Sequence, residues 1–600
     1  MKALFAVVLA VALPALGAAP AAGPAEWRGD LSPISTGDWS AARAAHLLER
    51  AGFGGTPEEI AALAAMAPRD AVRQLVYYQS IEDGLPPFDE SGIHDPGLEP
   101  FPASRPAATD LAKEKGESMG VKVKPEGNRR LQPVANKFFY WLRASRLETH
   151  RLAYWWANRM LLTRRPLQEK MALFWHGHFA TSEEKVRDYR KMLRQNRLFR
   201  DKGTGNFRDL LIGVAQDPAM LAYLDAGVNV KGAPNENFAR EIMELFTMGV
   251  GNYSERDIRE AARAFTGWNF VDLDFTVSPD KHDAGVKRVL GSEGRFDGVD
   301  VIDVILSRPV TSEFVAGKIY RYFVRQDLSP ELKAALGAKL RESHYEIAPL
   351  LETIFLSRDF YSPASVATRI KPPVDLVVST YRKLGLKEIP GVPDFNDVTE
   401  MLGQKLFFPP TVAGWAQGRS WITPGLLLAR GNFVYDVVYP DINFVPPDRY
   451  PSNDYKIREV NDKLAQGLDV TAATKPDAKD MTSMSMQMAD RDEDFNTRLA
   501  SYRGWQMAIE KVKPIPRATA QVDLPAMVLG AGCRSPREAV DYLLRRFLSV
   551  QVDASTQDRI AKFLESEIGT TDLSQARTYL DEPLRTTLHV ILSLPEYQLG

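Results

Sequence analysis

The feature that most constrains this chain is a helix-start signal that recurs along its length. Thr56-Pro57-Glu58-Glu59 combines an N-cap residue, a proline at the first helical position and a capping-box acid. Ser535-Pro536-Arg537-Glu538 repeats the combination. Between such starts, as in residues 258–265, apolar side chains recur at helical spacing. The sequence therefore predicts an all-α protein with a large, bundle-like, multi-helix fold.

Strand signals are confined to one short region. From Trp268 to Val277, apolar residues partly alternate with polar ones, and Val286 to Leu290 could form a second short strand. We therefore predict at most a small β-hairpin near residues 268–290.

The N-terminal 22 residues are typical of a secretory signal peptide. Lys2 supplies a positive charge, an apolar run extends from Ala3 to about Leu16, and small residues continue to Ala22. The apolar run is too short to span a bilayer as a helix. We expect cleavage between Ala18 and Ala22, and a periplasmic or secreted protein with no membrane span after cleavage.

Cysteine content and charge exclude several classes of protein. Cys533 is the only cysteine, which argues against an internal disulfide, cysteine-bound zinc or an iron–sulfur cluster. The 75 basic residues nearly balance the 77 acidic ones, so the chain lacks the basic excess expected of a nucleic-acid-binding protein. No G-x-S-x-G elbow, phosphate-binding Walker loop or H-E-x-x-H motif is present.

Composition divides the chain into a leader and five further segments. Proline, glycine and charged residues are dense in one stretch, and a polar, methionine-bearing tract forms another. We predict a signal peptide (1–22), an N-terminal helical segment (23–82), a Pro/Gly-rich linker or loop (83–128), a main helical domain (129–440), an extended, Met-bearing linker (441–525) and a C-terminal helical segment (526–600).

Two parts of the chain share a pattern. Residues 319–361 and 543–597 are each predicted as two helices followed by a helix that ends in Leu-Ser-x-x-x-Tyr. An internal duplication and a chance similarity between amphipathic helices both account for this pattern.

Five strings of residues, in order, carry a resemblance to a known family. They are His46–Gly54, Phe174–Phe179, Pro234–Glu241, Ala261–Trp268 with His282-Asp283 after it, and Phe408–Trp415 with Trp421-Ile422 after it. From about residue 40 to 435 the chain resembles the exported bacterial family filed as domain of unknown function 1800. The resemblance implies a helical exported protein. Members are often encoded beside a second exported family that looks like a relative of sulfatases or phosphatases, which implies a co-exported partner.

His178 is the first candidate site residue. If the helix that begins near Pro166 continues, His178 lies on its apolar face and His176 points the opposite way, so one metal could not use both. Gly177 could instead end this helix. The alternative is that His178 is a hydrogen-bonded core histidine and His176 is exposed.

Glu241 and Glu244 form a second candidate. They lie on a helix that Asn235 is expected to cap, along a ridge beside its apolar stripe. Carboxylates at the edge of a core either pair with arginines, here Arg259 and Arg263, or take part in chemistry.

A shared site is the sharpest hypothesis. His282 and Asp283 follow the predicted hairpin, which would return them over the same helices. We predict that they share a cavity with His178, Glu241 and Glu244, the last three being catalytic. Carboxylate and imidazole ligands together suit a divalent metal such as zinc, manganese or iron, which is the expected cofactor. The alternative for His282-Asp283 is an Asx turn with a solvated histidine.

An aromatic loop is a candidate binding surface. Trp415, Arg419 and Trp421 lie in a glycine-containing loop, where exposed aromatic rings could stack on a sugar or a partner. The alternative is a loop that folds back to plug the core.

Four methionines are a candidate copper site. Met481, Met484, Met486 and Met488 would supply the soft sulfur ligands that select Cu(I). The alternative is a flexible linker that contains methionine by chance.

Two functions are consistent with these sequence features. One is a binding or assembly partner of the second, co-exported protein, favoured by the lack of a catalytic motif and by the family's usual neighbour. The other is a metal- or carboxylate-dependent hydrolase of an extracellular or periplasmic substrate, favoured by the histidine and carboxylate candidates.

Overall fold

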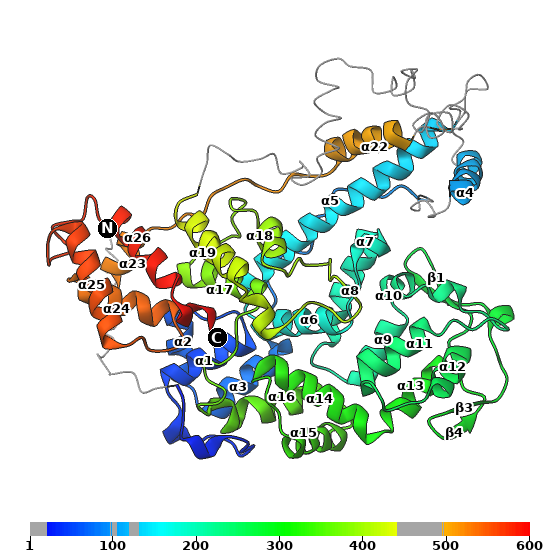
Figure 1. The fold of residues 1–600 in the computed structure, drawn as a ribbon, viewed down its shortest axis with the longest axis horizontal. Helices are drawn as coiled ribbons and strands as arrows, with labels where there is room; N and C mark the ends of the chain where they lie inside the picture. The colour runs from blue at the N-terminus through cyan, green and yellow to red at the C-terminus, as the bar shows by residue number, and fades with distance from the viewer. Residues whose placement is uncertain (1–20, 97, 99–104, 119–130, 441–494, 496) are drawn as a thin grey trace, which may run out of the picture.

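The computed structural model describes residues 21–96, 98, 105–118, 131–440, 495 and 497–600. Their regular secondary structure is helical apart from two short antiparallel hairpins, which confirms the predicted all-α class (Figure 1). The predicted signal peptide falls almost wholly outside the described residues, and the four methionines between 481 and 488 lie entirely outside them.

Many of the helices begin at the capping signals seen in the sequence. Thr56, Ser254 and Ser535 all form capping boxes. The helices up to the hairpins are α1 (Ala41–Ala51), α2 (Pro57–Ala64), α3 (Pro68–Val76), α4 (Arg105–Ser118), α5 (Gln132–Leu162), α6 (Pro166–His178), α7 (Glu183–Val186), α8 (Tyr189–Lys202), α9 (Phe207–Ala215), α10 (Pro218–Tyr223), α11 (Asn237–Met243) and α12 (Glu255–Ala264). Those after the hairpins are α13 (Gly298–Leu306), α14 (Pro309–Phe323), α15 (Pro330–Glu342), α16 (Ile347–Leu356), α17 (Pro373–Leu384), α18 (Phe395–Met401), α19 (Pro424–Val438), α22 (Thr497–Lys511), α23 (Leu524–Gly530), α24 (Pro536–Phe547), α25 (Ala554–Ile568) and α26 (Asp581–Leu592).

The sheet structure differs in detail from the predicted single hairpin. Strands β1 (Trp268–Val271) and β2 (Asp274–Val277) pair with each other, so the predicted first strand is itself a hairpin. Asp272 turns the chain there with a φ of 52°. A second hairpin joins β3 (Lys287–Val289) to β4 (Ser292–Gly294). The alternation of apolar residues located the strands but did not reveal the turn, because Asp-Leu is not a typical turn sequence.

Helices α6 and α17 form the centre of the molecule. Every residue of α17 is buried, and so is every residue of α6 except Gly177. The N-terminal helices, the middle of the chain and the C-terminal helices contribute side chains to the same connected core. In Figure 1, α1 and α3 lie below this centre and α23–α26 lie to its left. The segments that composition separates therefore pack together in one core.

The two predicted linkers contain helices. Helix α4 lies in the stretch 83–128, whose run of alanine, lysine and glutamate favours a helix between the flanking prolines. Helix α22 lies in the stretch 441–525 and packs along α5 (Figure 1). Ala500, Gly504 and Ala508 recur at four-residue spacing and are buried, so small side chains line the contact. The described parts of both segments are therefore partly helical.

Helix α5 is the longest described helix, with 31 residues. Neither α5 nor any other helix in the described part of the chain combines the length and the apolar character needed to cross a membrane.

The two similar parts of the sequence adopt similar element orders. Helices α14, α15 and α16 are followed by a 3-10 helix at Asp359–Tyr361, and α24, α25 and α26 by one at Pro595–Gln598. Tyr361 and Tyr597, the last residues of the shared pattern, are both fully buried. Both parts therefore end in the same way, with a tyrosine anchored in the core.

The close packing of α22 on α5 predicts a specific mutational effect. A β-carbon at Gly504 would lie 2.5 Å from the backbone of Phe139 and Tyr140. We expect Gly504→Ala to lower the free energy of unfolding by ~1–3 kcal/mol, because backbone atoms have to move. Urea unfolding of both proteins measures this change.

Gly530→Ala is the matched control. Gly530 is also helical, but a β-carbon there would meet open space. We expect this variant to be neutral or more stable by up to ~1 kcal/mol. Equal destabilisation by the two substitutions would contradict the close contact.

Candidate functional site

His178 is fixed by a hydrogen bond to a π-helix. The segment Glu244–Met248 is a π-helix that continues α11, and the Nε2 of His178 lies 3.0 Å from the carbonyl oxygen of Phe246 within it. The carbonyl accepts, so Nε2 carries the proton. Burial lowers the pKa of His178 to about 3, so the ring is neutral. His178 is therefore the hydrogen-bonded core histidine of the alternative interpretation.

His176 is buried, and the expectation that it is exposed was wrong. Helix α6 runs through Gly177, so His176 does point away from His178, but this side of the helix is also covered. Its Nε2 accepts the backbone N–H of Phe407 at 3.0 Å, and burial lowers its pKa to about 3. The two histidines therefore join α6 to two different parts of the chain.

Glu241 and Glu244 lie at the junction between α11 and the π-helix. The N-cap residue of α11 is Glu236 and not the predicted Asn235, although the side chain of Asn235 accepts the N–H of Asn237 at 3.0 Å just before the helix. Glu241 is half-buried, and burial and then the neighbouring Glu244 raise its pKa. Glu244 accepts the hydroxyl of Tyr253. A π-helix is rare and often marks a functional position, so this pair of carboxylates remains of interest.

The arginines expected to pair with these glutamates contact other acids. Arg259 lies 3.8 Å from Glu236, and Arg263 pairs with Glu260 and Asp283, both at 2.8 Å. The predicted pairing of Arg259 and Arg263 with Glu241 and Glu244 is therefore wrong, because both arginines contact other acids.

His282 and Asp283 are held in their loop by local contacts. The Nδ1 of His282 lies 2.9 Å from the carbonyl oxygen of Thr266. Asp283 accepts the N–H of Gly285 at 2.9 Å, which makes an Asx turn. Its hydrogen bond from Arg263 lowers the pKa of Asp283 to about 2. This geometry corresponds to the Asx turn of the alternative interpretation.

The predicted shared metal centre does not form in this structure. Among the residues described, no three His, Cys, Asp or Glu side chains are grouped so as to hold a metal ion. One ring nitrogen of His178 and one of His282 bond to backbone carbonyls, and Asp283 accepts hydrogen bonds from Arg263 and Gly285. Of the five residues predicted to share this site, Glu241 and Glu244 lie close enough to interact, because Glu244 raises the pKa of Glu241.

The aromatic loop is folded into the core. Trp415 and Trp421 are buried, and only Arg419 of the three candidate residues is exposed. The ring of Trp415 packs edge-on against His176, with centroids 5.1 Å apart. Gly414, with a φ of 84°, lets the loop approach Gly177, because a β-carbon there would lie 2.4 Å from the Gly177 carbonyl. The prediction of exposed, stacking tryptophans was therefore wrong, since the loop plugs the core.

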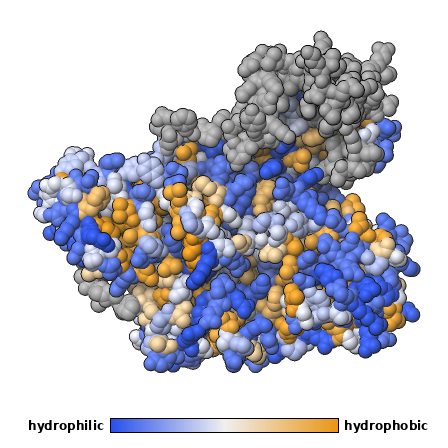
Figure 2. Space-filling view, viewed as in Figure 1, coloured by the Kyte–Doolittle hydropathy of each residue, from blue (hydrophilic) through white to orange (hydrophobic). Residues whose placement is uncertain are grey.

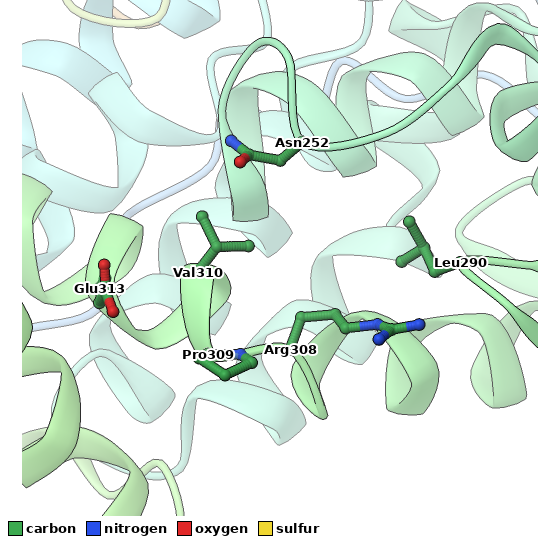
Figure 3. A pocket seen from close by; sticks show the side chains of 6 residues that line it. All are labelled: Asn252, Leu290, Arg308, Pro309, Val310 and Glu313. Atoms are coloured by element: carbon green, nitrogen blue, oxygen red, sulfur yellow. The ribbon is translucent and has the colours of Figure 1, made fainter.

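A surface cavity lies beyond the C-terminal end of the π-helix. It has a volume of 520 Å³ and is lined by Asn252, Leu290, Arg308, Pro309, Val310 and Glu313 (Figure 3). Asn252 donates to the carbonyl of Met248, the last residue of the π-helix, at 2.9 Å. The cavity lies beside the π-helix, and neither Glu241 nor Glu244 lines it.

Glu183, whose carboxyl group is buried, was not identified from the sequence. Glu183 is buried at the start of α7, and burial raises its pKa to about 8, so it is protonated at neutral pH. The hydroxyl of Ser145 donates to it at 2.9 Å. Thr181-Ser182-Glu183-Glu184 looks like an ordinary exposed helix start, so no local signal pointed to its burial.

Comparison with known proteins gives one match. A family model described as "Protein of unknown function (DUF1800)" matches residues 46–599. No curated protein and no solved structure matches the chain.

The environment of Glu241 predicts the effect of neutralising it. Burial and Glu244 disfavour its charge, and no hydrogen bond stabilises it among the described residues. We expect Glu241→Gln to hold or raise the free energy of unfolding at pH 7, by up to ~1 kcal/mol. Because the folded pKa is raised, the gain should vanish below about pH 4, where both states are protonated. Urea unfolding at several pH values measures it.

Glu169→Gln is the matched control. Glu169 is fully buried and accepts N–H groups of Trp156, Arg159 and Arg200, all within 3.1 Å. Its neutral isostere leaves buried arginines poorly compensated, so we expect a loss of ~3–5 kcal/mol. A comparable loss in Glu241→Gln would show that Glu241 has a buried cationic partner.

Proposed function

This chain belongs to the DUF1800 family, whose function is unknown, and we propose that it is an exported binding or assembly protein for a second, co-exported protein. The signal-peptide pattern of residues 1–22 supports export to the periplasm or beyond. The hydrogen bonds that occupy both histidines of α6 and the His282-Asp283 loop also favour a binding role over catalysis at these residues.

The observation that carries this proposal is an apolar helix face open to solvent. Helix α19 buries one side through Phe433 and Val434, while Leu427, Leu428 and Tyr435 on its other side are exposed. Leu428 and Tyr435 are seven residues apart, so they lie on the same face two turns apart. Single exposed apolar residues are common in proteins, but contiguous ones mark interaction sites.

Helix α26 extends this surface. The ring of Tyr435 packs on His589 of α26, with centroids 5.5 Å apart, and the next residue, Val590, is exposed. We call the surface made by Leu427, Leu428, Tyr435 and Val590 the α19 face. Figure 2 shows hydrophobic side chains gathered over this part of the molecule. Leucine and tyrosine on a rigid helix are well suited to fill pockets of a protein partner.

The partner we propose is the sulfatase- or phosphatase-like exported protein that is often encoded beside members of this family. An interface centred on the α19 face would present apolar side chains to an apolar pocket of that protein, with a polar rim from Asp436 and Thr586.

A carboxylate-dependent hydrolase remains the second candidate, and one observation favours it. Glu241 is partly accessible, its pKa is raised, and Glu244 lies next to it at the π-helix. A carboxyl group with a raised pKa can act as a general acid. Chromogenic phosphate, sulfate, ester and glycoside substrates test this alternative, since Glu241→Gln should abolish any hydrolysis without loss of stability.

A charge on the α19 face should weaken the proposed complex. We expect Leu428→Glu to raise the Kd for the purified product of the neighbouring gene by at least ~10-fold, because a carboxylate would be buried in the interface. Surface plasmon resonance with the full-length chain measures the Kd.

Val271→Glu is the matched control, because Val271 on β1 is also 67% exposed, like Leu428. This variant should bind as tightly as the unmodified chain. The proposal fails if the neighbouring protein does not bind, or if both variants weaken binding equally.

A further inference from the structure

Charged side chains are concentrated in the interior between α1, α6 and α17. Glu49 pairs with Lys383 at 2.9 Å and lies 3.5 Å from Lys371. Close by, Asp375 pairs with Lys170 at 2.6 Å and with Arg369 at 3.2 Å. Arg50, next to Glu49 in α1, is only 1% exposed. We call these seven residues the interior charge cluster.

The interior charge cluster has more positive than negative side chains. Its five cations are Arg50, Lys170, Arg369, Lys371 and Lys383. Its two carboxylates are Glu49 and Asp375, so full ionisation leaves three side-chain charges uncompensated (5 − 2 = 3). Burying uncompensated charge is costly, and folded proteins avoid it unless a partner is present.

A second buried network in the same protein is balanced. Arg159 and Arg200 share the carboxylates of Asp83 and Glu169, which makes two cations and two anions. This network lies at the opposite end of α6 from the histidines and makes hydrogen bonds throughout. The chain can therefore close a buried ionic network without a surplus, which makes the surplus around Glu49 informative.

The surplus coincides with polar atoms that have no hydrogen-bond partner among the described residues. Arg50 donates one N–H to the carbonyl of Ser365 at 2.6 Å, but its Nε and Nη1 are buried without an acceptor. The Oδ1 of Asp375 is also buried without a hydrogen-bond partner, and the Nζ of Lys371 has only the ion pair with Glu49 at 3.5 Å. Burial, and after it the neighbouring charge of Arg369, lowers the pKa of Arg50 to about 9. Nε and Nη1 lie on different sides of the guanidinium plane's long axis, so each can donate to a separate oxygen acceptor.

We propose that the interior charge cluster binds one phosphate-type oxyanion, held by the free donors of Arg50 and Lys371. Two negative charges on the anion would reduce the surplus from three to one. The free Oδ1 of Asp375 is an acceptor, so the ligand must also offer a hydroxyl. Monohydrogen phosphate carries two negative charges and one P–OH near neutral pH, whereas sulfate and the dianion of a phosphate monoester have no such donor. The cluster therefore fits protonated phosphate better than sulfate.

The measurement uses the full-length chain. Phosphate released by acid denaturation of the dialysed protein is quantified, and the melting temperature is followed in phosphate, sulfate and chloride at equal ionic strength. We expect either about one retained phosphate per chain, or a Tm that rises by roughly 1 °C for each tenfold increase in inorganic phosphate. The proposal is overturned if the protein retains no phosphate and its Tm shows no phosphate-specific rise. An equal effect of sulfate overturns the role assigned to Asp375.

Two variants and a control locate the site. Arg50→Gln should abolish phosphate retention and the phosphate-dependent rise in Tm. Lys371→Met should weaken both, and it should fold because it removes an uncompensated buried charge. Arg159→Gln, in the balanced network, should lower Tm but leave the response to phosphate unchanged. A full phosphate response in Lys371→Met, or its loss in Arg159→Gln, contradicts the site.

The response to phosphate should also depend on pH. Burial and the charge of Lys383 lower the pKa of Lys371 to about 7, against the opposing effect of Glu49, and Arg430 and the ring of Tyr597 also face it. In the unfolded chain this lysine stays protonated to about pH 10. Above pH 7 the folded chain loses this proton and with it a cation for the anion. The phosphate-dependent shift in Tm should therefore shrink between pH 7 and pH 9.

Discussion

The packing of this protein depends on an ion pair between two buried helices at its centre. Helices α6 and α17 lie at the centre, and the pair Lys170–Asp375 joins them at 2.6 Å. An apolar contact would tolerate small shifts of one helix along the other, but a buried ion pair tolerates very little, because separating its charges in the interior is costly. The surrounding helices can pack in one way because this central pair fixes the register.

The two histidines of α6 also fix the positions of two segments that pack around this helix. On one side His178 donates to the π-helix, and on the other His176 accepts from Phe407. His176 must be neutral because it accepts at Nε2, and burial lowers the pKa of His178 to about 3, which keeps this ring neutral as well. His176 and His178, which suggested metal ligands in the sequence, thus connect a central helix to two peripheral segments by hydrogen bonds.

Local sequence patterns predicted the helices well. Features that depend on contacts between residues distant in sequence could not be predicted. The capping boxes at Thr56 and Ser535 were correctly located, because they depend on neighbouring residues alone. The pairing of Arg263 with Asp283 and the burial of Trp415 could not be predicted, since both depend on segments that only the folded chain brings together. Burial of charge was hardest of all, because Lys170 in a sequence looks the same whether it is solvated or enclosed.

The interior around Glu49 is completed by residues from the other end of the sequence. Gln598 accepts the backbone N–H of Lys371 at 2.8 Å and a side-chain N–H of Arg430 at 3.0 Å, and Tyr597 bonds to the hydroxyl of Thr380. During synthesis, the helices that carry these partners emerge long before the segment that covers them. The interior around Glu49 can therefore close only after the C-terminal residues that cover it have been synthesised.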